Sequence, residues 1–166
     1  EQPDYDRLNS LLKNNINWLD TALISMKKNF VTDSTNRIDK EMAMRYAFTA
    51  DAAATIRNDQ ERSPSLLISA AEAAIAADNF LKAVSIYDRI MIEYSTSKKA
   101  PQAEFMRAFT IENNLMDQPN AKKAYEDFIK KYPNDEFTDD AKAALKNLGK
   151  SPEELVKEFE KMNQNK

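Results

Sequence analysis

The chain has no cysteine, no histidine and a single glycine among its 166 residues. Without cysteine there is no disulfide and no thiolate nucleophile, and without cysteine and histidine zinc sites of the usual nitrogen and sulfur type are excluded. The serine–histidine–aspartate and cysteine–histidine catalytic groups are excluded for the same reason. One glycine cannot form a glycine-rich loop around a phosphate. We therefore expect a protein that is not an enzyme and that needs no cofactor or metal.

Two further patterns are missing from the sequence. No stretch approaches the roughly 18 uncharged apolar residues of a membrane-spanning helix. The net charge is −3 with both signs interspersed, so there is no basic face of the kind that binds nucleic acid. Glu1 stands where a Met would open a new chain, so we expect a trimmed or processed protein, with room upstream for a signal segment and a lipid anchor.

Paired carboxylates are the remaining route to acid–base chemistry. The densest acidic group is Asp135, Glu136, Asp139 and Asp140. Acidic residues at a helix start interact favourably with the helix dipole, and this group lacks the spacing and the glycine of a calcium loop. We interpret these residues as helix-start charges, and a hydrolase built only from carboxylates stays a minor alternative.

Apolar residues recur at steps of three and four along most of the chain, which predicts an all-α fold of about eight helices. Ser63 and Pro64 are expected at the N-cap and first position of the third helix. Ser151 and Glu154 form a capping box for the last one, and Gly149 suits the end of the helix before it. The expected helices cover about 4–29, 36–58, 63–78, 80–94, 100–115, 119–133, 137–148 and the residues after 151.

The sequence also contains an internal repeat. Ala121–Pro133, AKKAYEDFIKKYP, has an earlier counterpart in Ala83–Ser95, AVSIYDRIMIEYS. Alanine, tyrosine, a large apolar residue and tyrosine recur at one constant offset, at Ala83, Tyr87, Ile90 and Tyr94 and again at Ala121, Tyr125, Phe128 and Tyr132. A fixed 38-residue offset of this kind is typical of a helical repeat protein.

The repeat resembles the tetratricopeptide family. The matching positions are Leu67, Ala71, Phe80, Ala83, Tyr87 and Tyr94 in one copy, and Phe105, Ala108, Ala121, Tyr125, Tyr132 and Pro133 in the next. The chain departs from the family in lacking the usual Trp, in having Ala for the small Gly, and in a period longer than the family's usual length of about 34 residues.

Residues 80–148 resemble most the bacterial envelope subgroup of this family, above all through AYEDFIKKYPNDEFTDDAKAAL at Ala124–Leu145. That subgroup includes the C-terminal domain of the Tol–Pal-associated coordinator protein and the lipoprotein of the β-barrel assembly machine. Lys146–Phe159, KNLGKSPEELVKEF, is similar to tetratricopeptide lipoproteins of Bacteroides-type bacteria.

The resemblance implies a right-handed α-solenoid of antiparallel helix pairs. Residues 1–62 would form an N-terminal helical pair that packs on the array, 63–148 two repeats and the start of a third pair, and 149–166 a capping helix. The implied function is protein–protein interaction in the periplasm, with the chain anchored to the outer membrane; a cytoplasmic location is the alternative.

In the tetratricopeptide family the first helix of each pair lines a concave groove. That rule points to Ile68, Glu72 and Ile75 on one helix and to Met106, Thr110, Asn113 and Asn114 on another as residues that bind a peptide or protein partner. Asn113 and Asn114 have the alternative role of capping their own helix. A structural domain that associates with further copies of itself is the alternative function.

Overall fold

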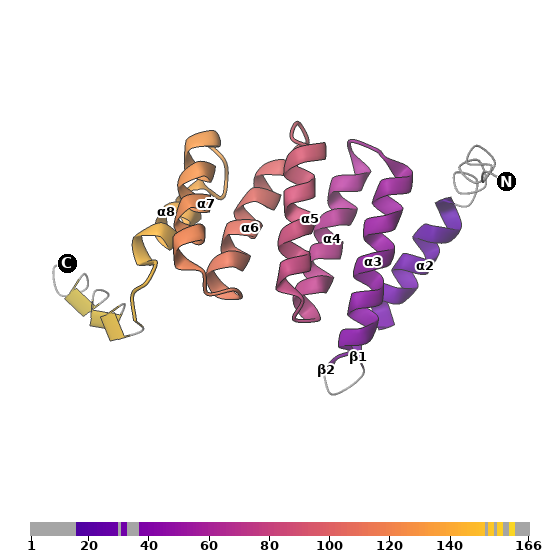
Figure 1. The fold of residues 1–166 in the computed structure, drawn as a ribbon, viewed down its shortest axis with the longest axis horizontal. Coiled ribbons are helices and arrows are strands. Elements are labelled where there is room, and N and C mark those ends of the chain that lie inside the picture. Colours follow the sequence, from indigo (N-terminus) through magenta and orange to yellow (C-terminus); the bar gives the residue numbers. More distant parts are fainter. Residues whose placement is uncertain are drawn as a thin grey trace. The chain divides into compact units, whose positions relative to one another are not determined.

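The computed structural model describes most of the chain, namely residues 16–29, 31–32, 37–151, 153–154, 156–157 and 160–161. The described part is helical apart from one antiparallel pair of two-residue strands, β1 and β2 (Figure 1). The elements in chain order are α2 (Ile16–Asn29), β1 (Val31–Thr32), β2 (Arg37–Ile38), α3 (Lys40–Arg57), α4 (Arg62–Ala76), α5 (Phe80–Glu93), α6 (Ala100–Asn113), α7 (Gln118–Lys131) and α8 (Thr138–Asn147). The all-α class is thus confirmed. The first part of the expected helix at 4–29 lies outside the described residues.

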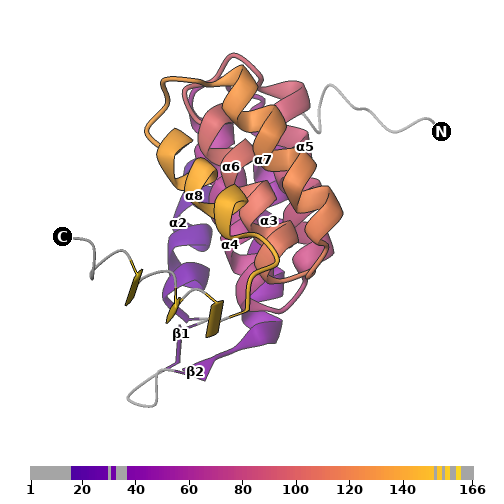
Figure 2. The same ribbon diagram turned by 90° about the vertical axis from the view of Figure 1, so that its left-hand side faces the viewer.

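The chain forms two compact units, Glu1–Ala103 and Glu104–Lys166. In the first unit α2 packs against α3, α3 against α4 and α4 against α5, and successive helices run in opposite directions (Figure 1). In the second unit α7 packs against α8 (Figure 2). The Phe105 ring on α6 lies 6.1 Å from the Tyr125 ring and 5.8 Å from the Phe128 ring of α7, between ring centroids. It also stacks on Phe137 at 5.0 Å.

The period of the sequence is present in the helix bounds. Helices α4, α6 and α8 begin at Arg62, Ala100 and Thr138, and α5 and α7 begin at Phe80 and Gln118. Each later start therefore follows its counterpart by the same offset that separates Ala83 from Ala121.

The caps before these helices recur with the same period. Asp59, Ser97 and Asp135 each accept a hydrogen bond from the backbone N–H two residues later, at 2.8, 3.2 and 3.0 Å. Such short side-chain bonds to the following backbone hold a turn in one conformation. The chain thus enters α4, α6 and α8 through turns of one design.

The turns inside the two pairs also match. Asp78 and Met116 have φ angles of 57° and 55°, a left-handed conformation that residues other than glycine adopt rarely. Asn79 and Asp117 follow them and accept the backbone N–H three residues later, as N-caps do. One local geometry therefore turns α4 into α5 and α6 into α7.

The repeated apolar positions fill the core of each unit. Ala83 and Ala121 are completely buried, as are Tyr87 and Tyr125. The two tyrosines differ at the hydroxyl. Tyr125 donates to Glu112 Oε2 at 2.7 Å, whereas the Tyr87 hydroxyl is buried without a hydrogen-bond partner among the described residues. The residue of the first unit that corresponds to Glu112 is Ala74, so no carboxylate is present at that position.

The expected N-cap role of Ser63 is wrong. α4 begins one residue before it, and the Asp59 carboxylate accepts the first free N–H groups, from Glu61 at 2.8 Å and Arg62 at 2.7 Å. Ser63 is instead buried, and its hydroxyl donates to the Ala54 carbonyl at 3.2 Å. Ser63 thus joins the start of α4 to the end of α3.

The expected helix start at residue 36 is wrong as well. Residues 37 and 38 are extended and pair with residues 32 and 31. Asp39 then caps α3 by accepting the Met42 N–H at 3.0 Å. A carboxylate N-cap preceded by a strand pair delays the helix to Lys40.

The expected capping box at the C-terminal end is confirmed. The Ser151 N–H donates to Glu154 Oε2 at 2.8 Å, and the Glu154 N–H donates to Ser151 Oγ at 3.2 Å. Gly149 has a φ of 79°, the left-handed backbone that suits glycine after a helix. A Cβ at this position would lie 3.1 Å from the Gln118 side chain.

The two core tyrosines provide a matched test of this packing. We expect Tyr125→Phe to lower the free energy of unfolding by about 1–2 kcal/mol, because it removes a hydrogen bond to a carboxylate. We expect Tyr87→Phe to change it by less than about 0.5 kcal/mol or to stabilise, because it removes a buried hydroxyl that has no described partner. Urea unfolding followed by circular dichroism measures both. Equal losses in the two variants would contradict the difference between the two sites.

Candidate functional site

Three of the expected groove residues lie on α4 in the first unit. Ile68 is buried, with 6% of its surface exposed. Glu72 is exposed and Ile75 is half-buried. Glu72 is therefore the most accessible of the three to a partner.

The other four expected groove residues lie on α6 and just after it, in the second unit. Thr110 is completely buried, and its hydroxyl donates to the Met106 carbonyl at 2.7 Å. Asn113 is exposed, and its side-chain amide donates to the Phe109 carbonyl at 3.1 Å. This bond lies within α6 and fits the alternative role of capping its own helix. Met106 and Asn114 are half-buried. Thr110 thus contributes to packing, while parts of the other three reach the surface.

A hollow of about 290 Å³ lies within the first unit, between α2 and α4. We call it the α2–α4 groove. Its floor is Tyr46 of α3, which is 3% exposed. The apolar walls are Leu23 and Ile24 of α2 and Leu66 of α4, and the polar ends are Asp20 and Lys27 of α2.

The two charged ends of the α2–α4 groove differ in their partners. The Asp20 carboxylate is paired with the Arg57 guanidinium of α3. The Lys27 ammonium is 3.4 Å from Ser69 Oγ on α4, its one contact among the described residues. That distance exceeds the usual 2.7–3.2 Å of an N–H···O bond, so the contact with Ser69 is weak and the exposed Lys27 ammonium faces solvent.

Tyr46 is held in its neutral form at the floor of the groove. Burial raises the pKa of its hydroxyl above the ordinary value, and the nearby Glu72 carboxylate raises the pKa further, although the hydrogen bond with Ser69 lowers it. A neutral phenol can both donate and accept hydrogen bonds. The groove thus combines apolar walls with the Tyr46 side chain at its floor and the exposed Lys27 ammonium at one end.

Another charged cluster in the first unit is structural. Asp51 of α3 accepts from Lys82 and from Arg89 of α5, each at 2.6 Å. Lys82 also lies 5.4 Å from the centre of the Phe48 ring. These charges pair with one another across two helices, so the cluster ties α3 to α5.

The second unit has a polar hollow of about 400 Å³. Glu112 and Asn113 line one side of it, and Asn147–Ser151 line another. Its polar groups are largely engaged inside the unit, since Glu112 accepts from Tyr125 and Glu154 accepts from Ser151. It therefore offers less to a ligand than the α2–α4 groove does.

Within the described residues, no group of three His, Cys, Asp or Glu residues is placed to hold a metal ion. None of the helices described is both long and apolar enough to cross a bilayer.

The comparisons with known proteins give no match. No protein-family model fits the chain, and neither the curated proteins nor the solved structures contain a significant match to it. The function must therefore be argued from the residues themselves.

The sequence reasoning missed all of the residues that line the α2–α4 groove, because it placed the binding surface on other residues of α4 and on α6. The signal that could have found them is the expected helix at 4–29, whose apolar stripe is wider than one neighbour can cover. Leu23 of that stripe is buried, whereas Ile24 beside it remains 60% exposed. An apolar residue just outside the buried stripe marks the edge of the groove.

The buried tyrosines predict a loss of stability at alkaline pH. Burial raises the pKa of Tyr46, Tyr87 and Tyr125 above the ordinary 10.0. Below pH 10 both the folded and the unfolded chain keep these protons. Above pH 10 the unfolded chain loses them first, so the free energy of unfolding falls by up to about 1.4 kcal/mol per pH unit for each such tyrosine.

Urea unfolding at a series of pH values from neutral to alkaline measures this loss. The Tyr87→Phe variant is the control for the other groups that titrate there, and its decline above pH 10 should be shallower than that of the parent chain. Parallel declines in the two proteins would contradict the raised pKa of Tyr87.

Proposed function

We propose that the chain is a non-enzymatic scaffold of tetratricopeptide-like repeats that binds a peptide or protein partner. In this proposal the helix pairs form a right-handed solenoid, and the first helix of each pair lines the binding groove. The observation that carries it is the periodic recurrence of helix starts, side-chain caps and left-handed turns. Chains that repeat one helix pair commonly present an extended concave surface to their partners.

The α2–α4 groove supports this proposal from the first unit. It lies between the first helices of two successive pairs, where a solenoid would place its binding surface. Its apolar walls can bury a side chain of a partner, and the exposed Lys27 ammonium can donate a hydrogen bond to a peptide. We also propose that the chain works in the bacterial envelope, on the resemblance of residues 80–148. Recovery of the native chain only from the cytosolic fraction of its host would contradict that location.

A peptide selection tests the binding function. We expect the full chain to enrich particular sequences from a random-peptide display library, because a partly apolar groove with polar groups at its ends discriminates between side chains. Enriched peptides carrying a benzophenone group should crosslink to α2, α4 or α6, as located by mass spectrometry. Scrambled peptides of the same composition are the control. A failure to enrich any peptide, or crosslinks confined to α5 and α7, would overturn the proposal.

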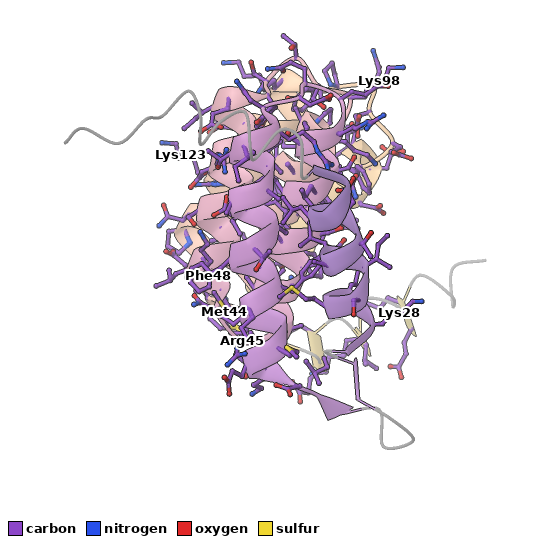
Figure 3. All side chains as sticks on the ribbon, turned by 90° about the vertical axis from the view of Figure 1, so that its right-hand side faces the viewer. Lys28, Met44, Arg45, Phe48, Lys98 and Lys123 are labelled. Atoms are coloured by element: carbon purple, nitrogen blue, oxygen red, sulfur yellow. The ribbon has the colours of Figure 1, made fainter. Side chains whose placement is uncertain are left out.

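Self-association is the second candidate function. Three large apolar side chains of the first unit are exposed on α3 and α5, namely Phe48 at 55%, Leu81 at 71% and Ile92 at 79%. Exposed apolar side chains of this kind can mark an interface when they form one patch. Figure 3 shows Phe48 together with Met44 at the edge of α3, and the Met44 sulfur lies 3.8 Å from the Asn79 amide nitrogen near Leu81.

Light scattering across a wide concentration range tests this second candidate. If the patch joins two copies, the mass should rise with concentration, and the double substitution Leu81→Lys with Phe48→Lys should return the chain to a monomer. The substitution Ile24→Lys in the α2–α4 groove is a control that adds charge away from α5. A parent chain that stays monomeric throughout would exclude self-association.

A further inference from the structure

The charges of the α2–α4 groove indicate the chemistry of its occupant. Asp20, Ile24 and Lys27 follow one another at steps of four and three, which places them on one face of α2. Leu66 and Ser69 are three residues apart on α4, which places them on one face of that helix. The groove is thus bordered by two short rows, each with an apolar residue followed about one turn later by a polar one.

The α2–α4 groove is small for a ligand site. Its whole volume of about 290 Å³ lies just below the roughly 300–1,000 Å³ typical of small-molecule sites. Ile24 is 60% exposed at the rim, so an occupant would cover apolar surface that now faces water. An aliphatic side chain of a peptide fits this requirement better than a cofactor does.

The charged end distinguishes between partners of different sign. Asp20 is already neutralised by Arg57, so a cation gains little there. Lys27 forms no ion pair with any described carboxylate and contacts only the neutral Ser69 hydroxyl. Glu72 is exposed one turn beyond Ser69 and does not pair with Lys27. Lys27 is exposed and unpaired with any described carboxylate, so its ammonium is open to an anionic group of a partner.

The geometry points to an extended peptide with an aliphatic residue and, two positions along, an acidic residue as the occupant of the α2–α4 groove. The aliphatic side chain enters between Leu23, Ile24 and Leu66, and the carboxylate accepts from Lys27 Nζ. In an extended chain, residues i and i+2 point to the same side and lie about 7 Å apart, so both side chains can face one groove. This inference deepens the proposed function and rests on it.

Three labelled heptapeptides that differ only in their central residues test the inference by fluorescence anisotropy with the full chain. Their cores are Leu-Ser-Asp, Leu-Ser-Lys and Ser-Ser-Asp. We expect Leu-Ser-Asp to bind about fivefold more tightly than Leu-Ser-Lys, the upper range for one exposed ion pair. We expect Ser-Ser-Asp to bind more weakly as well, because it buries no apolar side chain. Added salt should reduce the preference for Leu-Ser-Asp over Leu-Ser-Lys, because it screens the ion pair. It should leave the preference for Leu-Ser-Asp over Ser-Ser-Asp unchanged.

Two pairs of variants locate the binding. Lys27→Glu should reverse the preference toward Leu-Ser-Lys, whereas Lys28→Glu, with the same charge change at a residue outside the groove lining, should keep it. Figure 3 shows Lys28 near the end of α2. Ile24→Ser should weaken both leucine peptides, whereas Ile92→Ser, which makes the same change at an exposed position of α5, should not. Unchanged circular dichroism and urea midpoints show that each variant is folded.

The results separate this inference from the proposed function. If Leu-Ser-Asp shows no preference, or if Lys27→Glu and Lys28→Glu behave alike, the inference is wrong. If peptides from the random library nevertheless bind and crosslink to α4 or α6, the proposed function stands without it. If neither the designed nor the selected peptides bind, both are wrong.

Discussion

The close approach of α3 and α4 is the constraint on which the first unit depends. Ala43, Ala47, Ala50 and Ala54 recur at steps of four and three along α3, and all are completely buried. Ala70, Ala71 and Ala74 of α4 are completely buried as well. Small side chains reduce the distance between two helix axes, and they leave no long side chains to fix the register between the helices.

Because the helices are so close, a polar contact can fix their register. The Ser63 hydroxyl reaches the Ala54 carbonyl at the end of α3 and also accepts the Asp59 N–H at 3.0 Å. The Ser63 hydroxyl thus provides an acceptor for the Asp59 N–H and a second donor to the Ala54 carbonyl, which also accepts the Asn58 N–H at 2.9 Å. The large residues then pack around the alanine contact, with Leu67 of α4 and Tyr87 of α5 completely buried.

The same packing explains why the groove lies where it does. α3 is covered by α4 and tied to α5 through Asp51, so its remaining side packs against α2. Between α2 and α4 the floor of the groove is then the Tyr46 side chain of α3. A concave surface with an apolar rim follows from this arrangement, and the charges at its ends decide what chemistry suits it.

The helix class, the repeat and several local caps could be predicted from the sequence. They depend on neighbours a few residues apart, through apolar spacing, proline and glycine positions, and side chains that bond to nearby backbone. The capping box at Ser151 and the start of α5 at Phe80 are of this kind. The position of Ser63 was misjudged because its partner is the Ala54 carbonyl, which belongs to the preceding helix.

The residues that line the candidate site could not be predicted from the sequence. Of the expected binding residues, Glu72 is exposed whereas Thr110 is buried, because helical spacing does not say which neighbour covers a face. By itself, the sequence determined that the chain forms helices and that a helix pair recurs along it with a fixed period, since both follow from short-range patterns. Only the tertiary structure decided that Ile24, Tyr46 and Leu66 border one groove and that Lys27 meets no anionic partner among the residues described around it. These relations join residues that only packing brings together.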